Sequence, residues 1–419
     1  MNSLYNTPDT LSPKKKRLPL SGSRTSLVIA VIISAIIPLW RCVFFLPQPP
    51  VMFYYGALGI LAIMALLSAR SRVNWSAIWF LCWCAGSIML NTFSGYYSPW
   101  SRLFGLTMLL IAVGPMLANH RLLEWRKKAL TVLLWGCVVI SVISFLLYYI
   151  ARPLTLFQGF MFQGITPQPM LLSPIAFVGT LFLVQYYMKR VKNAGLVYKI
   201  LLWVGVAICL FAGILSGSRS ALLSFLVAFV VWLGLFLRST KKFLIVIGSI
   251  ALVCLVSFPT WSSYTETLQD KMKASEKAGS LLSSRENLWE QRWDEFKSKP
   301  VFGIGFSQVK YTTEGVDTSK WAEGSGVVEP GNGWLFVLSS TGIGSFILII
   351  WIYLKNVWKL VRLRSFEAML ALSMLIFIGV HNFAEGYMLS SGSFFCLVFW
   401  LCLGLSYCLP QPYKKPKWE

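Results

Sequence analysis

Two short polar segments place an arginine beside small hydroxyl residues, at points where a helix is predicted to begin. The first is residues 216–219 (Ser-Gly-Ser-Arg) and the second is residues 283–286 (Ser-Ser-Arg-Glu). Guanidinium groups bind phosphate oxygens in a bidentate manner, and backbone N–H groups at helix N-termini favour anions. An interface arginine in the first segment and a capped surface helix in the second are the alternatives. The candidate anion-binding residues are Ser218, Arg219, Ser284 and Arg285.

Two further polar segments carry groups that suit proton transfer. Residues 329–335 read Glu-Pro-Gly-Asn-Gly-Trp-Leu, and residues 381–385 read His-Asn-Phe-Ala-Glu within an apolar run. Ionisable groups inside a membrane span are functional candidates, and a carboxylate whose pKa is raised by burial can act as a general base. A turn leading into a packed helix, and a structural hydrogen-bonding pair, are the alternatives. The candidate catalytic residues are Glu329, Asn332, His381 and Glu385.

Other sequence patterns indicate structural roles rather than catalytic or ligand-binding roles. Residues 299–306 contain Gly-x-Gly but lack the third glycine and the βαβ context of a dinucleotide site, so a tight turn returning the chain to the membrane is expected. All nine cysteines lie in or beside apolar runs, which is typical of buried small side chains rather than a disulfide framework. Cys82 and Cys84 have no second ligand pair, and no acidic metal cage is evident. We expect no metal and no cofactor.

The composition shows which elements must position these residues. Hydrophobic residues make up 56% of the 419 residues and charged residues only 13%, about half the share of a soluble domain. Spanning helices need about 20 mostly apolar residues. The sequence predicts an all-α integral membrane protein with about twelve spans, near residues 26–46, 51–69, 75–93, 101–118, 129–150, 168–187, 200–216, 220–237, 243–259, 333–354, 368–386 and 392–409.

The distribution of basic residues predicts the orientation. Alternate loops and both termini carry 25 of the 38 Lys and Arg residues, and such segments face the cytoplasm. The net charge of +22 therefore reflects membrane topology and does not indicate nucleic-acid binding. We expect a multi-pass protein of inner-membrane type with both termini in the cytoplasm. The predicted order is a basic cytoplasmic tail (1–25), nine spans (26–259), a large, partly helical loop on the non-cytoplasmic side (260–332), three spans (333–409) and a cytoplasmic tail (410–419).

Taken in order, the polar segments resemble the motifs of the bacterial O-antigen ligases and the Wzy-like polymerases of O-antigen and exopolysaccharide. The matching runs are Ser-Gly-Ser-Arg-Ser-Ala-Leu (216–222), Ser-Arg-Glu-Asn-Leu-Trp (284–289), Asn-Gly-Trp-Leu (332–335) and Asn-Phe-Ala-Glu (382–385), the last followed by Trp400. The resemblance covers roughly residues 200–405 by motif and the whole chain by topology. It implies a GT-C-like fold.

The resemblance also implies a function. Members of this family join an undecaprenyl-diphosphate-linked glycan to an acceptor on the periplasmic side. Arg219 and Arg285 match the two arginines that would bind the diphosphate. A glycosyltransferase that polymerises glycan repeats is the first expectation, and ligation to lipid A core is the alternative. Membrane lipids, a lipid A core acceptor and a chain-length regulator are the implied partners. A glycan transporter or a non-catalytic assembly partner represents another class, disfavoured because no internal repeat is evident.

One position departs from the family pattern. The family usually has His-Asn where this chain has Gly331-Asn332, and that histidine is the expected base or acceptor contact. The nearest substitutes are Glu329 and Asn332 in the loop, or His381 and Glu385 near a late span. The departure weakens the ligase interpretation more than the polymerase interpretation.

Overall fold

The computed structural model describes residues 21–68, 71–92, 98–157, 161–190, 195–261, 265, 269–270, 272–273, 283–310 and 330–410. Glu329 lies outside these residues, as do both termini. The helices are α1 (Ser21–Arg41), α2 (Val51–Leu66), α3 (Trp75–Met89), α4 (Pro99–Ala112), α5 (His120–Ile150), α6 (Pro169–Arg190), α7 (Leu196–Leu215), α8 (Arg219–Leu237), α9 (Thr240–Trp261), α11 (Ser283–Ser298), α12 (Gly333–Leu363), α13 (Phe366–His381) and α14 (Phe394–Cys408). The connecting segments contain two short antiparallel strand pairs. They are β1 (Arg72–Val73) with β2 (Leu117–Ala118), and β3 (Leu156–Phe157) with β4 (Met161–Phe162).

The apolar helices agree with the predicted spans. In the described ranges, α5, α6, α7, α8, α9 and α12 are long and apolar enough to cross a membrane by length and composition. Six shorter apolar helices, of 10–17 residues, accompany them. Each of the predicted spans overlaps one of these helices. The prediction of an all-α membrane protein is thus confirmed, whereas the number of crossings and the orientation stay predictions.

The helix α5 begins earlier than predicted. The segment 119–128 was expected to be a loop, but residues 120–128 form the first turns of the helix. Asn119 is the N-cap of this longer helix. The guanidinium of Arg126, in the second turn, is buried. It donates hydrogen bonds to the carbonyl oxygens of Leu117 (2.8 Å) and Gly404 (3.1 Å), and to Sγ of Cys408 (3.0 Å). A buried charge needs such partners. Arg126 therefore joins α5 to β2 and to the end of α14.

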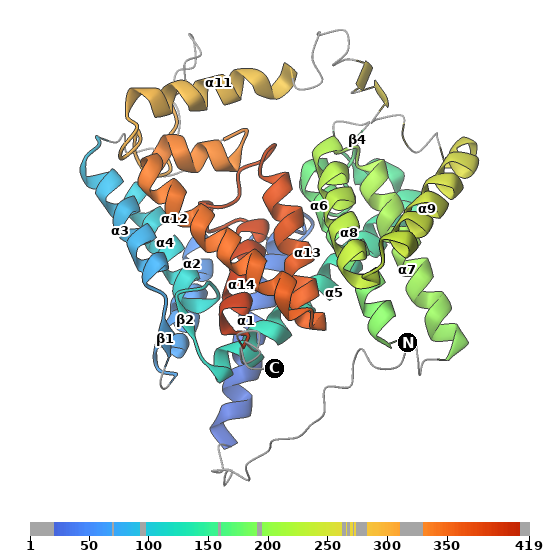
Figure 1. Ribbon diagram of the computed structural model, residues 1–419, viewed down its shortest axis with the longest axis horizontal. Coiled ribbons are helices and arrows are strands. Elements are labelled where there is room, and N and C mark those ends of the chain that lie inside the picture. Colours follow the sequence, from blue (N-terminus) through green and yellow to red (C-terminus); the bar gives the residue numbers. More distant parts are fainter. Residues whose placement is uncertain are drawn as a thin grey trace.

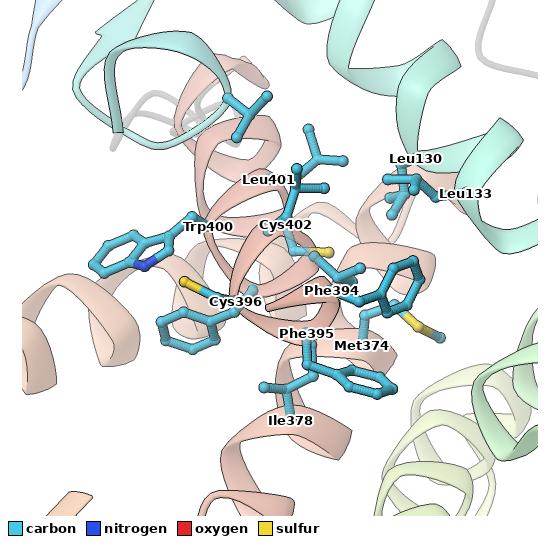
Figure 2. Packing of buried hydrophobic residues seen from close by; sticks show 14 of the residues in the cluster. Leu130, Leu133, Met374, Ile378, Phe394, Phe395, Cys396, Trp400, Leu401 and Cys402 are labelled. Carbon is cyan, nitrogen blue, oxygen red and sulfur yellow. The ribbon is translucent and has the colours of Figure 1, made fainter. Parts of the chain in front are cut away.

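The centre of the bundle is α14, which is apolar on all sides and is accordingly buried on all sides. Figure 2 shows its side chains, including Phe394, Phe395 and Trp400, surrounded by residues from α5 and α13. Helices α6 to α9 gather on one side of this centre, and α2, α3 and α4 on the other (Figure 1). The helix α11 lies across one end of the bundle and packs on α12. The strands β1 and β2 lie at the opposite end (Figure 1).

The helix α12 is broken at Gly342, and the segment 300–305 fills the break. Gly342 has φ of 80° and ψ of −179°, a backbone conformation that only glycine adopts readily. The break frees the carbonyl groups of Ser339 and Ser340, which accept hydrogen bonds from two amides of the segment at 2.9 and 3.0 Å. The amide of Ile343 donates in turn to the first residue of the segment at 2.9 Å. The predicted turn at 299–306 thus anchors the chain between α11 and α12.

The helix α3 fastens the same segment from the other side. The indole Nε1 of Trp83 donates to the carbonyl oxygen of Thr341 at 3.1 Å, and its ring stacks on Phe302 with centroids 4.8 Å apart. The side chain of Asn91 donates to the carbonyl oxygen of Gly303 at 3.1 Å. These contacts hold the segment that follows α11 to the bundle.

Candidate functional site

The arginine motif of the sequence forms the turn from α7 into α8. Ser216 is buried, and its hydroxyl donates to the carbonyl oxygen of Pro169 at 2.9 Å. Ser218 is the N-cap of α8, where its hydroxyl accepts a hydrogen bond from the amide of Ala221 at 3.4 Å. Arg219 is the first residue of the helix and is half-buried. The predicted helix start is therefore confirmed, and Arg219 stands where amide dipoles favour an anion.

The hydroxyl of Ser220 connects this turn with the end of α13. Its Oγ lies 3.3 Å from Nε2 of His381, which is 1% exposed. The imidazole stacks between the rings of Phe377 and Tyr387, with centroid distances of 5.7 and 5.6 Å. Among the described residues, Nδ1 of His381 has no hydrogen-bond partner. The contact joins residues 161 positions apart, and the ring packing restricts the imidazole to this orientation.

The segment after α13 is a tight turn that holds Glu385. The carbonyl oxygen of His381 accepts hydrogen bonds from the amides of Ala384 and Glu385, both at 3.0 Å. The side-chain oxygen of Asn382 accepts from the amide of Tyr387, also at 3.0 Å. Because the turn is bonded internally at both ends, it presents the Glu385 side chain from a fixed backbone.

Across this turn, Glu385 meets Arg285 of α11. Nη2 of Arg285 lies 2.8 Å from Oε1 of Glu385, and the two side chains are 14% and 20% exposed. Both are thus reachable from solvent while largely covered by protein. The pair connects the sequence motif at residues 284–289 with the motif at residues 382–385. Two candidates that were predicted for different roles, anion binding and catalysis, are therefore bonded to each other.

The N-terminus of α12 packs against the same turn. The amide of Gly333 lies 2.7 Å from the carbonyl oxygens of Asn382 and Glu385. Asn332 is the N-cap of this helix, and its side-chain oxygen accepts from the amides of Trp334 and Leu335, both at 3.0 Å. Its side chain is 3% exposed. Asn332 therefore orients α12 beside Glu385, and its oxygen is engaged by the helix.

Gly331, which stands where the family usually has histidine, is covered by α11. Its φ is 69°, and a β-carbon built on it would lie 2.7 Å from Cβ of Leu288. Its carbonyl oxygen accepts a hydrogen bond from Nε1 of Trp289 at 3.2 Å. Real β-carbons essentially never approach a neighbour so closely. The departure from the family pattern thus has a physical basis, because no side chain fits at position 331 while α11 lies here.

The structure brings most of the predicted candidates to one place. Ser218 and Arg219 come from α8, Arg285 from α11, Asn332 from the start of α12, and His381 and Glu385 from the end of α13. Glu329 lies outside the described residues, and so does the side chain of Ser284. Sequence reasoning did not single out Ser220 or Tyr387. The hydroxyl beside Arg219 was a usable signal for Ser220, whereas nothing local indicated the stacking of Tyr387.

The site combines the Arg285 guanidinium, the Glu385 carboxylate and the buried imidazole of His381 at one end of a helical bundle, and Arg219 begins the adjoining helix α8. Such a set can bind a phosphate group, stabilise negative charge that develops on it, and accept a proton. Within the described ranges, no group of three or more His, Cys, Asp or Glu side chains is placed to hold a metal ion.

Fold and site together define an α-helical membrane protein with a polar site between α8, α11 and the end of α13. Residues 204–349 match the model of a family described as O-antigen ligase, so the resemblance seen in the motifs is confirmed. The matched segment includes Arg219, Arg285 and Asn332, whereas His381 and Glu385 lie beyond it. The match indicates an enzyme similar to the O-antigen ligases and polymerases. No curated protein matches the chain.

Proposed function

We propose that this protein is a membrane glycosyltransferase that polymerises undecaprenyl-diphosphate-linked glycan repeats on the periplasmic side of the inner membrane. The observation that carries the proposal is the pairing of Arg285 with Glu385 at 2.8 Å, beside the α8 N-terminus that begins at Arg219. The family match covers both arginines. The products are O-antigen or exopolysaccharide, and the lipid-linked glycan is both donor and acceptor.

In this proposal the two arginines bind and stabilise the diphosphate leaving group. The acceptor hydroxyl oxygen forms a bond to the anomeric carbon of the donor, and the bond between that carbon and the diphosphate oxygen breaks. The electron pair of the broken bond stays on the diphosphate, whose negative charge grows. Arg219 and Arg285 bind this diphosphate, and preorganised cations stabilise such charge most effectively where water is largely excluded.

Glu385 accepts the proton of the acceptor hydroxyl. When the diphosphate binds Arg285, it competes with Glu385 for the guanidinium, and the carboxylate becomes available to the hydroxyl. His381 and Asn332 are positioning residues in this scheme. His381 holds the α8 turn through Ser220 at 3.3 Å, and Asn332 caps the helix whose first amide contacts the Glu385 carbonyl. Glu329 is the alternative base.

The test compares Arg219→Ala and Arg285→Ala with Arg152→Ala. Arg152 is an exposed arginine predicted on the same side of the membrane, where its guanidinium lies over the ring of Tyr148. We expect the two site variants to shorten the surface polymer in cells and to abolish extension of a purified lipid-linked repeat. Arg152→Ala is expected to behave like the wild type. Normal polymer length in both site variants, at normal protein levels, would refute the proposal.

Ligation to lipid A core is the second candidate, favoured by the description of the matched family as O-antigen ligase. The two reactions share the donor and differ in the acceptor. An assay that offers the purified protein lipid A core in one reaction, and only lipid-linked repeat in another, separates them. Elongated lipid-linked glycan without core supports polymerisation. Product that forms only when core is present supports ligation.

A further inference from the structure

A separate cavity of about 400 Å³ opens at the end of the bundle that the charge distribution predicts to face the cytoplasm. It lies between α1, α5, α6, α13 and α14. Its size falls within the usual range of small-molecule pockets, roughly 300–1,000 Å³. None of the candidate residues of the polar site lines it. Its lining includes three lysines and one glutamate, namely Lys127, Lys128, Lys189 and Glu367.

The charges at the mouth of this cavity are unbalanced. Nζ of Lys189 lies 3.5 Å from Oε1 of Glu367, and also 4.0 Å from the ring centroid of Phe366. The positive charge of Lys189 is thus balanced by Glu367, and the lysine lies against α13. Lys127 and Lys128 on α5 form no ion pair with any described residue. Two positive charges therefore face the cavity mouth without an ion-pair partner in the described ranges, and Glu124 stands one turn before them on α5.

The rest of the cavity is apolar. Phe182 of α6, Leu370 of α13 and Leu405 of α14 are buried side chains in its wall, and Val31 and Tyr186 are half-buried beside them. The lining therefore changes from cationic at the ends of α5 and α6 to hydrocarbon further inside. A free anion would gain nothing from that wall, and an apolar molecule would gain nothing from the lysines. A ligand with a negative head and a hydrocarbon tail matches both parts.

We propose that this cavity binds an anionic phospholipid of the cytoplasmic leaflet. Lys127 and Lys128 contact the phosphate head group, and an acyl chain lies along the accessible apolar side chains of Val31, Val132 and Tyr186. Basic residues close to the cytoplasmic surface attract anionic lipids, and basic pockets between spanning helices bind their head groups. The ion pair of Lys189 with Glu367 connects α6 and α13 at the side of the pocket. This site is independent of the glycan chemistry proposed above.

The test is native mass spectrometry of the purified full-length protein with phosphatidylglycerol, phosphatidylethanolamine or inorganic phosphate. The test variant is Lys127→Gln/Lys128→Gln. Its matched control is Lys241→Gln/Lys242→Gln, which removes two exposed lysines at the start of α9, predicted on the same side. We expect the wild type and the control to retain phosphatidylglycerol in preference to phosphatidylethanolamine. The test variant should bind phosphatidylglycerol roughly thirtyfold more weakly, since each basic residue near the surface contributes about 1 kcal/mol.

A second variant, Thr131→Phe, fills the cavity from α5 without changing charge and should also reduce phosphatidylglycerol binding. It decides the question if the double lysine variant does not fold. Three results would overturn the proposal. They are equal retention of the two phospholipids, unchanged phosphatidylglycerol binding in the variants that fold, and displacement of the lipid by an equal concentration of inorganic phosphate. The last result would identify a free-anion site instead.

Discussion

Nη2 of Arg285, near the start of α11, lies 2.8 Å from Oε1 of Glu385, 100 residues further along the chain. The pair connects α11 with the turn after α13, beside the α8 N-terminus. It shows that the cation proposed to bind the diphosphate and the carboxylate proposed to accept a proton are neighbours. Binding of a diphosphate to Arg285 would therefore change the surroundings of Glu385 directly.

Replacing Glu385 with Gln tests whether this carboxylate accepts the proton. Glutamine keeps the shape and can still contact Arg285, so we expect the protein to fold. Glycan extension by the purified protein should fall by about 10²–10⁴-fold, the usual contribution of a general base. The measurement is the rate of extension of a lipid-linked repeat, with protein level and thermal unfolding as controls.

The reversed pair Arg285→Glu/Glu385→Arg separates packing from chemistry. The exchange preserves an ion pair between α11 and the turn, so thermal unfolding should stay close to that of the wild type. Activity should not return, because the cation and the base have exchanged places. Recovery of extension in the reversed variant, or full activity in Glu385→Gln, would show that the pair is only structural.

His381→Phe tests the positioning role of the imidazole. Phenylalanine preserves the stacking on Phe377 and Tyr387 and removes the contact with Ser220. We expect a stability change of about 1 kcal/mol, as for loss of one hydrogen bond. Extension should slow in His381→Phe and, to a similar degree, in Ser220→Ala. A much larger loss in His381→Phe than in Ser220→Ala would instead indicate that the imidazole itself takes part in proton transfer.

Gly331→Ala tests the packing of α11 on the loop before α12. The substitution places a β-carbon 2.7 Å from Leu288 at a φ of 69°, so both contact and backbone conformation become unfavourable. We expect a loss of about 1–3 kcal/mol in unfolding free energy. The matched control is Gly248→Ala in α9, where no atom lies within 4 Å of the new β-carbon and stability should not fall. Equal melting temperatures of the two variants in detergent would contradict the packing described here.

The raised pKa of the buried Glu295 carboxyl predicts that stability depends on pH. This residue of α11 is buried, and burial raises the pKa of its carboxyl above the ordinary value of 4.5, although Arg292 at 3.0 Å and the amide of Lys310 at 2.7 Å oppose the shift. In the window between 4.5 and the raised pKa, the folded state binds the proton more tightly than the unfolded state. The contribution of Glu295 to stability therefore falls as the pH rises through this window.

Unfolding measurements between about pH 4 and about pH 8 check this sign. Glu295→Gln should lose the slope, at a lower overall stability because Arg292 loses its ion-pair partner. Glu290→Gln, an exposed change on the same helix, should keep the slope of the wild type. A wild-type stability that rises through the window, or an unaltered slope in Glu295→Gln, would contradict the prediction.

Much of the fold follows from local properties of the sequence. Runs of apolar residues predict the spanning helices because each helix satisfies its own backbone hydrogen bonds, whatever its neighbours are. The start of α5 and the break in α12 were not predicted in this way. The first turns of α5 are polar in sequence, so hydropathy does not mark them, and Arg126 is buried there through its hydrogen bonds to Leu117 and Gly404. The residue types at the site were also evident locally, since arginine and carboxylate in an apolar chain are costly.

The sequence by itself determined the class of the protein, the candidate side chains and the family they resemble. Only the tertiary structure decided which of them meet. It paired Arg285 with Glu385 and Ser220 with His381. It also left no room for a side chain at position 331, next to Leu288, and placed the segment 300–305 in the break of α12. The physical reason is that hydropathy and helix capping act within a few residues. Ion pairs and packing act between segments whose approach depends on the whole bundle.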